Sequence, residues 1–210
     1  MQSETHPLHT SVRDLIEGLR TLEAQTITKS RVAEFLAASP IRVEALSPYI
    51  FWRDNGYTRN LIYRDALFEV MAICWGPGQK TPVHTHNGQL GWMSVVQGEI
   101  LTHQYRYARC SSPENQNVIG MDCLAGAHDV ELERLDTVKC SHDGHVVTVD
   151  KLQTIHQIEN ADPSRAGCVS LHVYSKPIDS CVAFDLDKHL CWRRSLTFYS
   201  SGGDVLSGER

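Results

Sequence analysis

The apolar residues of the first fifty positions recur at the spacing of amphipathic α-helices. In segment 10–24 they follow one another at three- and four-residue steps, which places them on one helix face, and Ser11 is a suitable N-cap. A second helix is expected from near Ser30 to just before Pro40, because helical geometry is disfavoured in the residue that precedes a proline. The apolar faces comprise Val12, Leu15, Ile16, Leu19 and Leu22 in the first helix, and Val32, Phe35 and Leu36 in the second.

From position 57 onward the pattern changes to short runs rich in β-branched and aromatic residues, which are separated by turn residues. Many such runs at nearly regular spacing, with no helical pattern between them, indicate a mainly β fold, either an antiparallel sandwich or a barrel. The predicted strands are 57–63, 66–75, 92–96, 99–107, 145–150, 154–159, 168–175 and 180–186.

The two patterns together predict a single domain over residues 1–210. Its parts are a helical cap at 1–50, an antiparallel β-barrel at 57–199 and a mobile Gly/Ser-rich tail at 200–210, with a long polar loop at 110–120. A chain of 210 residues is long enough to bury a substantial core.

Composition narrows the class of protein. The net charge is −5 and no basic cluster appears, which argues against nucleic acid as a partner. No apolar run approaches the ~20 residues that span a bilayer, and the polar N-terminus lacks the core of a signal peptide, so we expect a cytoplasmic protein without a membrane partner. The seven cysteines are odd in number and form no Cys-x-x-Cys pair, which is typical of reduced thiols.

Three histidines have the spacing of a metal site. Residues i and i+2 of a strand share a face, so His84 and His86 would present two imidazoles side by side. His156, in an alternating run about seventy residues later, could supply a third ligand, because strands distant in sequence can be neighbours in a barrel. An isolated His-x-His pair is weak evidence by itself, and the alternative is a pair of ordinary strand histidines.

The surrounding residues strengthen the prediction of a metal. They resemble the two signature motifs of the cupin superfamily, and this resemblance implies a small jelly-roll-like β-barrel with a metal in its mouth. One departure stands out, because the place of the usual cupin glutamate ligand is taken by Leu90 and Gly91. The residues that carry the resemblance are Gly78, His84, His86, Gly98, His156 and Asn160.

A site of three histidines without a carboxylate has a distinct charge. Three neutral imidazoles leave a divalent metal with its full charge of about +2, whereas two histidines and one carboxylate leave about +1. Such a site favours anionic ligands from outside, and a thiolate is the obvious candidate because a metal lowers the pKa of a bound thiol.

Two further groups of residues suggest a pocket. Tyr57 and Arg59 would share one face of the first barrel strand, where an arginine pointing inward calls for an anion such as a carboxylate. Ser170, His172 and Tyr174 would share one face of a late strand. The alternatives are a surface ion pair for Arg59 and ordinary strand alternation for the other three.

With these residues in place, the chain resembles the cysteine dioxygenases from about Tyr57 to Asp185. The stretches YTRN, CWGPGQKTPVHTH, HQIEN, SLHVY and PIDSCVAFD each look like the corresponding family segment and occur in the family's order. The resemblance implies that one Fe(II) per chain is bound by the three histidines and that Arg59, with Tyr57 beside it, holds the substrate carboxylate. It also implies that Tyr174 lies near the substrate and O₂, oriented through His172 and Ser170.

The resemblance has further implications at two positions. Cys181 matches a cysteine that the family places near the pocket entrance. Gly91 stands where mammalian members have a cysteine that becomes covalently linked to the tyrosine that Tyr174 matches, and glycine is common there in bacterial members. Because glycine has no sulfur, this chain cannot form the cross-link.

The implied activity is oxidation of L-cysteine by O₂ to cysteine sulfinic acid (3-sulfinoalanine), without an organic cofactor, by a monomer. A first alternative is a 3-mercaptopropionate dioxygenase, although those relatives place glutamine where this chain has Arg59. A second alternative is a non-catalytic cupin that binds a small anion. A third is a zinc or manganese isomerase in the same barrel, for which a site of three histidines is less suitable.

Overall fold

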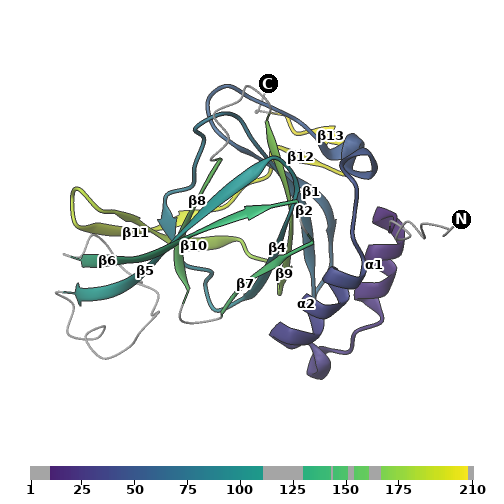
Figure 1. Ribbon diagram of the computed structural model, residues 1–210, viewed down its shortest axis with the longest axis horizontal. Coiled ribbons are helices and arrows are strands. Elements are labelled where there is room, and N and C mark those ends of the chain that lie inside the picture. The colour runs from purple at the N-terminus through teal and green to yellow at the C-terminus, as the bar shows by residue number, and fades with distance from the viewer. Residues whose placement is uncertain (1–9, 111–129, 143, 151–153, 161–166, 208–210) are drawn as a thin grey trace, which may run out of the picture.

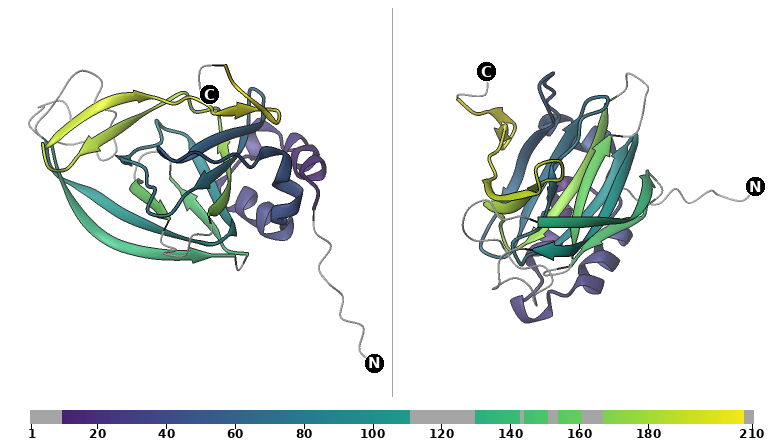
Figure 2. Two further views of the ribbon diagram at one scale, coloured as in Figure 1. Left: turned by 90° about the horizontal axis from the view of Figure 1, so that it is seen from above. Right: turned by 90° about the vertical axis from the view of Figure 1, so that its left-hand side faces the viewer.

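Two facing β-sheets and a helical layer make up the molecule. The computed structural model describes residues 10–110, 130–142, 144–150, 154–160 and 167–207. Within this part of the chain the helices cover the outer face of one sheet, and the second sheet closes the opposite side (Figures 1 and 2). The prediction of a mainly β fold of antiparallel strands with an N-terminal helical cap is confirmed. No helix in the described residues is both long and apolar enough to cross a membrane.

The helical layer contains two α-helices, α1 (Val12–Arg20) and α2 (Lys29–Ala38), and two 3₁₀ segments, η1 (Ala24–Thr26) and η2 (Val43–Tyr49). Ser11 caps α1 as predicted, because its side chain accepts a hydrogen bond from the backbone N–H of Asp14. Helix α2 begins at Lys29, close to the expected start, and Thr28 is its cap because its side chain accepts a hydrogen bond from the backbone N–H of Arg31. The indole N–H of Trp92 donates to the carbonyl of Lys29, which ties α2 to the sheet.

Each sheet brings together strands that are distant in sequence. In the described residues one sheet has seven strands in the order β13-β12-β1-β2-β9-β4-β7, and the other has six in the order β11-β10-β3-β8-β5-β6. Pairing is antiparallel except between β1 and β12. The strands are β1 (Thr58–Arg64), β2 (Glu69–Trp75), β3 (Val83–His84), β4 (Leu90–Gln97), β5 (Glu99–Cys110), β6 (Val130–Ser141), β7 (Val146–Val149), β8 (Ile155–Asn160), β9 (Cys168–Ser175), β10 (Ser180–Asp185), β11 (Leu190–Ser195), β12 (Ser200–Ser201) and β13 (Asp204–Val205).

The predicted strands are all present, but the predicted ranges missed the two-residue strands β3, β12 and β13 and the longer strands β6 and β11. Strands β6 and β11 are largely exposed, so neither presents the apolar alternation that marks a half-buried strand. Strand β6 pairs with β5 and β11 pairs with β10, and these two pairs extend away from the rest of the barrel in Figure 1. The predicted polar loop at 110–120 lies outside the described residues except for Cys110, which ends β5.

The prediction of a mobile tail is wrong for residues 200–205. Strands β12 and β13 form a short hairpin there, and β12 runs parallel to β1 at the edge of the seven-stranded sheet. The hydroxyl of Ser200 donates to the side-chain carbonyl of Asn60 at 2.9 Å, and both residues are buried. The reason is that Gly202 and Gly203, which suggested flexibility, adopt the positive φ values that a tight hairpin turn requires.

Apolar cores lie on both faces of the seven-stranded sheet. One core packs α1 and α2 against its outer face, and a second fills part of the space between the sheets. Strand β2 is buried along its whole length because it is covered on both faces, which explains its nearly continuous apolar sequence. The remaining space between the sheets holds the polar residues described next.

Candidate metal centre and substrate pocket

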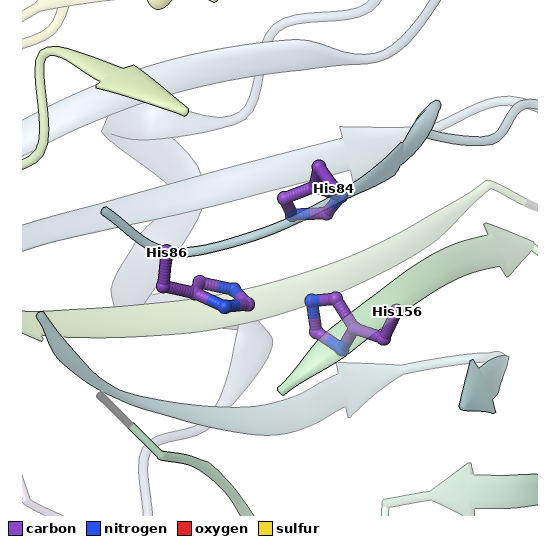
Figure 3. Close-up of side chains that lie close together, drawn as sticks. All are labelled: His84, His86 and His156. Atoms are coloured by element: carbon purple, nitrogen blue, oxygen red, sulfur yellow. The ribbon is translucent and has the colours of Figure 1, made fainter. Parts of the chain in front are cut away.

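The three predicted histidines converge between the two sheets. His84 ends β3, His86 follows two residues later, and the antiparallel pairing of β3 with β8 sets His84 opposite His156. Their potential ligand atoms all lie within 4.8 Å of one another, and Figure 3 shows the three rings facing a common point. The ring centroids are 4.6–5.1 Å apart. The group contains no carboxylate, as the sequence indicated.

The hydrogen bonding of these rings leaves nitrogen atoms without protein partners. Nδ1 of His84 lies 3.0 Å from the carbonyl of Pro82, so its Nε2 is the atom available to a metal. Within the described part of the chain, Nδ1 of His86 and both ring nitrogens of His156 are buried with no hydrogen-bond partner. Unpaired buried polar atoms are costly, and a cation bound among them would remove that cost. The donor set therefore fits a divalent metal.

Burial also prepares the histidines for metal binding. It lowers the pKa of His84 to about 4 and holds the pKa values of His86 and His156 well below the ordinary value, and the neighbouring imidazoles lower the latter two further. The rings are consequently neutral at neutral pH, which is the form that coordinates a metal.

Gly91 lies where a side chain has no room. A Cβ atom at this position would lie 2.5 Å from Cγ2 of Val149 and 3.0 Å from the Tyr174 ring. Tyr174 and Val149 occupy the space that a side chain at position 91 would need, so the packing leaves no room for a carboxylate there.

Ser170, His172 and Tyr174 form a hydrogen-bonded chain along β9. The Ser170 hydroxyl lies 2.8 Å from Nε2 of His172, and Nδ1 of His172 lies 3.3 Å from the Tyr174 hydroxyl oxygen. The indole N–H of Trp75 donates to the Ser170 oxygen at 2.9 Å, a contact that the sequence did not suggest. An indole can only donate, so Ser170 accepts from Trp75 and directs its own proton to His172.

The direction of these hydrogen bonds determines where the hydroxyl proton of Tyr174 points. Burial lowers the pKa of His172 to about 3, so its ring is neutral and has one N–H. If Nε2 accepts from Ser170, the N–H is on Nδ1 and donates to the oxygen of Tyr174. Burial raises the pKa of Tyr174 and keeps the phenol protonated, so its O–H remains to donate into the cavity.

Arg59 is buried beside the cavity, not placed in a surface ion pair. One guanidinium nitrogen donates to the carbonyl of Thr197 at 3.2 Å, and the group lies 5.0 Å above the Phe198 ring. Its ionic partner is Glu69 at 3.5 Å, which is fully buried and which sequence analysis missed. Burial raises the pKa of Glu69, while the charges of Arg59 and Arg64 lower it by less. The signal in the sequence was a single acidic residue inside an apolar run.

Two adjoining cavities, which share several lining residues, lie beside these groups. The inner cavity is lined by the metal-site histidines His84 and His86, by His172 and Tyr174, and by Tyr57, whose ring stacks on Trp75 at 4.7 Å. Ser170 lies behind His172 and does not line the cavity, whereas Cys181 does and is buried. The outer cavity, about 480 Å³ in volume, opens toward solvent. Residues that line both, and so form a neck between them, are Tyr57, Arg59, Thr81, Pro82, Arg194 and Leu196.

Comparisons of the sequence with known proteins agree on one family. A family model described as cysteine dioxygenase type I matches residues 1–187. Cysteine dioxygenase type 1 of Bos taurus is 25% identical over 195 residues, covering 92% of this chain and 88% of that protein. The Rattus norvegicus enzyme of the same name is 27% identical over 196 residues, with the same coverage of both chains.

Solved structures give more distant likenesses. The protein TT1209 from Thermus thermophilus aligns with a TM-score of 0.42 and 14% identity, covering 63% of this chain and 95% of that one. A sugar phosphate isomerase of the cupin superfamily from Silicibacter pomeroyi aligns with a TM-score of 0.40 and 14% identity, covering 74% of this chain and 83% of that one.

Proposed function

The chain belongs to the cysteine dioxygenase type I family, and from this membership and the cavity we propose that it oxidises L-cysteine with O₂ to cysteine sulfinic acid at an Fe(II) site. The observation that carries the proposal is a cluster of three neutral histidines without a carboxylate, enclosed between the sheets next to a buried arginine. The cluster suits a metal that must accept a thiolate, and the arginine suits a small substrate with a carboxylate.

His84, His86 and His156 would hold one Fe(II) per chain through ring nitrogens that lie within 4.8 Å of one another. Bound Fe(II) supplies the redox chemistry that allows O₂ to react with the substrate sulfur. Because the three ligands carry no charge, they leave the positive charge of the metal to be balanced by the substrate thiolate. This selects thiols over alcohols and amines of the same size.

Arg59 and Tyr57 bind the substrate carboxylate at the neck of the cavity. Arg59 is held from behind by Glu69 and Thr197, so its orientation is set before the substrate arrives. The distance between the neck and the histidines then determines which thiols reach the metal with their carboxylate bound. When a substrate without a carboxylate binds, the buried guanidinium of Arg59 receives no anion from solution.

Tyr174 donates a hydrogen bond to the negative charge that develops on oxygen as sulfur is oxidised. The chain from Trp75 through Ser170 and His172 directs the tyrosine proton toward the cavity. Gly91 gives Tyr174 no covalent tether, so packing and this hydrogen bond hold the ring in place.

The reaction balances without an external reductant. One thiol and one O₂ give one sulfinic acid: two sulfur–oxygen bonds form, the O–O bond breaks, and sulfur supplies the four electrons that reduce both oxygen atoms. The chain therefore needs L-cysteine, O₂ and the metal. The cytoplasmic location and the monomeric state remain predictions.

Oxygen uptake by protein reconstituted with Fe(II) tests this function. Addition of L-cysteine should consume one O₂ per thiol and yield sulfinic acid, and 3-mercaptopropionate at equal concentration should be the poorer substrate. Preference for 3-mercaptopropionate would transfer the assignment to that thiol. A lack of oxygen uptake with either thiol, while both bind, would instead favour a non-catalytic anion-binding cupin.

A further inference from the structure

A second arginine lines the neck of the cavity. Arg194 on β11 lies directly opposite Cys181 on β10 in the antiparallel register, and paired residues of this kind place their side chains on the same face of the sheet. Cys181 is buried and lines the inner cavity, so Arg194 is also directed inward, and it lines both cavities. The next residue toward the N-terminus, Arg193, instead donates to Asn87 and Ser180 outside the cavity.

The two arginines of the neck differ in how their charge is balanced. Arg59 has the buried carboxylate of Glu69 as a partner and already donates to Thr197. Within the described residues the guanidinium of Arg194, unlike its backbone, has no ion pair and no hydrogen bond, and no acidic side chain lines either cavity. A half-buried guanidinium without a partner in the protein is suited to an anion from solution.

Because Arg59 already has partners in the protein, some of the hydrogen bonds that the substrate carboxylate can accept must come from another group. A carboxylate can accept about four hydrogen bonds, and a guanidinium whose fork already contacts Glu69 and Thr197 has fewer N–H groups to offer. Arg194 lines the same neck from the opposite sheet, because Arg59 is in β1 and Arg194 is in β11. A carboxylate at the neck can therefore meet one arginine from each sheet.

We propose that Arg194 is a second binding residue for the substrate carboxylate, which it holds together with Arg59 at the neck of the cavity. The inference rests on the proposed function, since the carboxylate is that of the thiol substrate. It assigns selectivity for anionic thiols to a residue outside the motifs that identified the site. Cysteamine, which has the thiol and the amine of cysteine but no carboxylate, gains nothing from Arg194.

Binding under argon tests the proposal separately from turnover. Protein loaded with Fe(II) is titrated by calorimetry with 3-mercaptopropionate or cysteamine, which share a thiol and differ in the carboxylate. For Arg194→Gln we expect the Kd of 3-mercaptopropionate to rise about 10- to 100-fold, the range for loss of a charge-assisted hydrogen bond, while the Kd of cysteamine does not rise. Arg194→Lys, which keeps the charge, should recover part of the affinity.

Arg193→Gln is the matched control, because it removes the same charge from the adjacent position of the same strand. Its Kd for 3-mercaptopropionate should stay within about twofold of the wild-type value. Equal losses in the two variants would show that only long-range attraction is involved and would overturn the proposal. An unchanged Kd in Arg194→Gln, or equal weakening of both thiols, would overturn it as well.

The proposed function is tested by a different result. If the wild-type protein binds the thiols as described but consumes no O₂ with L-cysteine, the dioxygenase assignment fails while Arg194 keeps its role in anion binding. If the wild type oxidises L-cysteine and the kcat/KM of Arg194→Gln equals that of Arg193→Gln, the dioxygenase assignment stands and the role of Arg194 is refuted.

Discussion

The two ends of the inner cavity differ in the formal charge that the protein contributes. At the metal end, burial of three histidines lowers their pKa values far below neutral pH, and the protein contributes no formal charge. At the neck, Arg59 and Arg194 contribute positive charge, and only Arg59 has a carboxylate behind it. The difference indicates which ligand suits the cavity: a small molecule with one anionic group for the metal and another for the arginines.

The largest effect is expected from removing a ligand at the metal end. His156→Gln should lose bound metal on desalting and lower oxygen uptake more than about 100-fold, because loss of a ligand costs more than loss of an outer hydrogen bond. Metal analysis and oxygen uptake measure the two effects. His103→Gln is a suitable control, because His103 is also buried but bonds Thr137 and Glu159 away from the cluster. Equal metal contents in the two variants would remove His156 from the site.

The next largest effect concerns the proton that Tyr174 directs into the cavity. Tyr174→Phe should lower kcat about 100-fold with little change in KM, as expected for a hydrogen bond that matters mainly in the transition state. Tyr63→Phe removes a hydroxyl that bonds Asp65 instead, and it should leave kcat unchanged. A fall in kcat/KM through KM alone would assign Tyr174 to substrate binding.

The packing around Gly91 gives a smaller effect on stability. Gly91→Ala should lower the free energy of unfolding by about 1–3 kcal/mol, because the new Cβ atom overlaps the Val149 side chain and crowds Tyr174. Denaturation in urea measures this loss. Val149→Ala in the same chain should restore part of it, whereas additive losses would show that the two side chains do not meet. The same overlap opposes Gly91→Cys as a way to introduce the cross-link to Tyr174.

The smallest effect tests the carboxylate behind the neck. Glu69→Gln removes the ionic partner of Arg59, so the KM for L-cysteine should rise about tenfold as the guanidinium loses its fixed orientation. Stability at pH 7 should change little, because burial raises the pKa of Glu69 and the charged form gains little net free energy from its ion pairs. Steady-state kinetics and urea denaturation separate the two effects.

The difference in stability between the wild type and Glu69→Gln should change with pH in a definite direction. A carboxyl group whose pKa is raised by folding contributes most stability below its unfolded pKa and loses that contribution as the pH rises through the folded value. The wild type should therefore gain stability relative to Glu69→Gln as the pH falls from 7 toward 4.5, the ordinary pKa of a glutamate. A relative loss would mean that the ion pairs outweigh the cost of burial.

The metal end was predictable from the sequence, and the neck was predictable only in part. The spacing of His84 and His86 fits a strand and the barrel pattern suggested His156 as a third member of the group, although β3 ends at His84 and the resemblance to cupin motifs was needed to strengthen the prediction. Arg194 lies in a strand that lacks apolar alternation, and its meaning depends on the pairing of β11 with β10. Long-range register of this kind is not encoded in any short stretch of sequence.

Glu69 and the C-terminal hairpin illustrate two other limits. Glu69 looked like one charge in an apolar strand, and only the arrangement of β1 beside β2 showed that it faces Arg59 and Arg64. Gly202 and Gly203 were interpreted as flexibility although they form a tight turn. In both cases the local composition was clear, and the tertiary partner determined the structure.

Isotope labelling of the product tests the central claim most directly. The protein loaded with Fe(II) is given L-cysteine under ¹⁸O₂ and the product is analysed by mass spectrometry. The account predicts cysteine sulfinic acid in which both oxygen atoms on sulfur are ¹⁸O. Cystine as the product, or sulfinic acid in which only one oxygen atom derives from O₂, would contradict it.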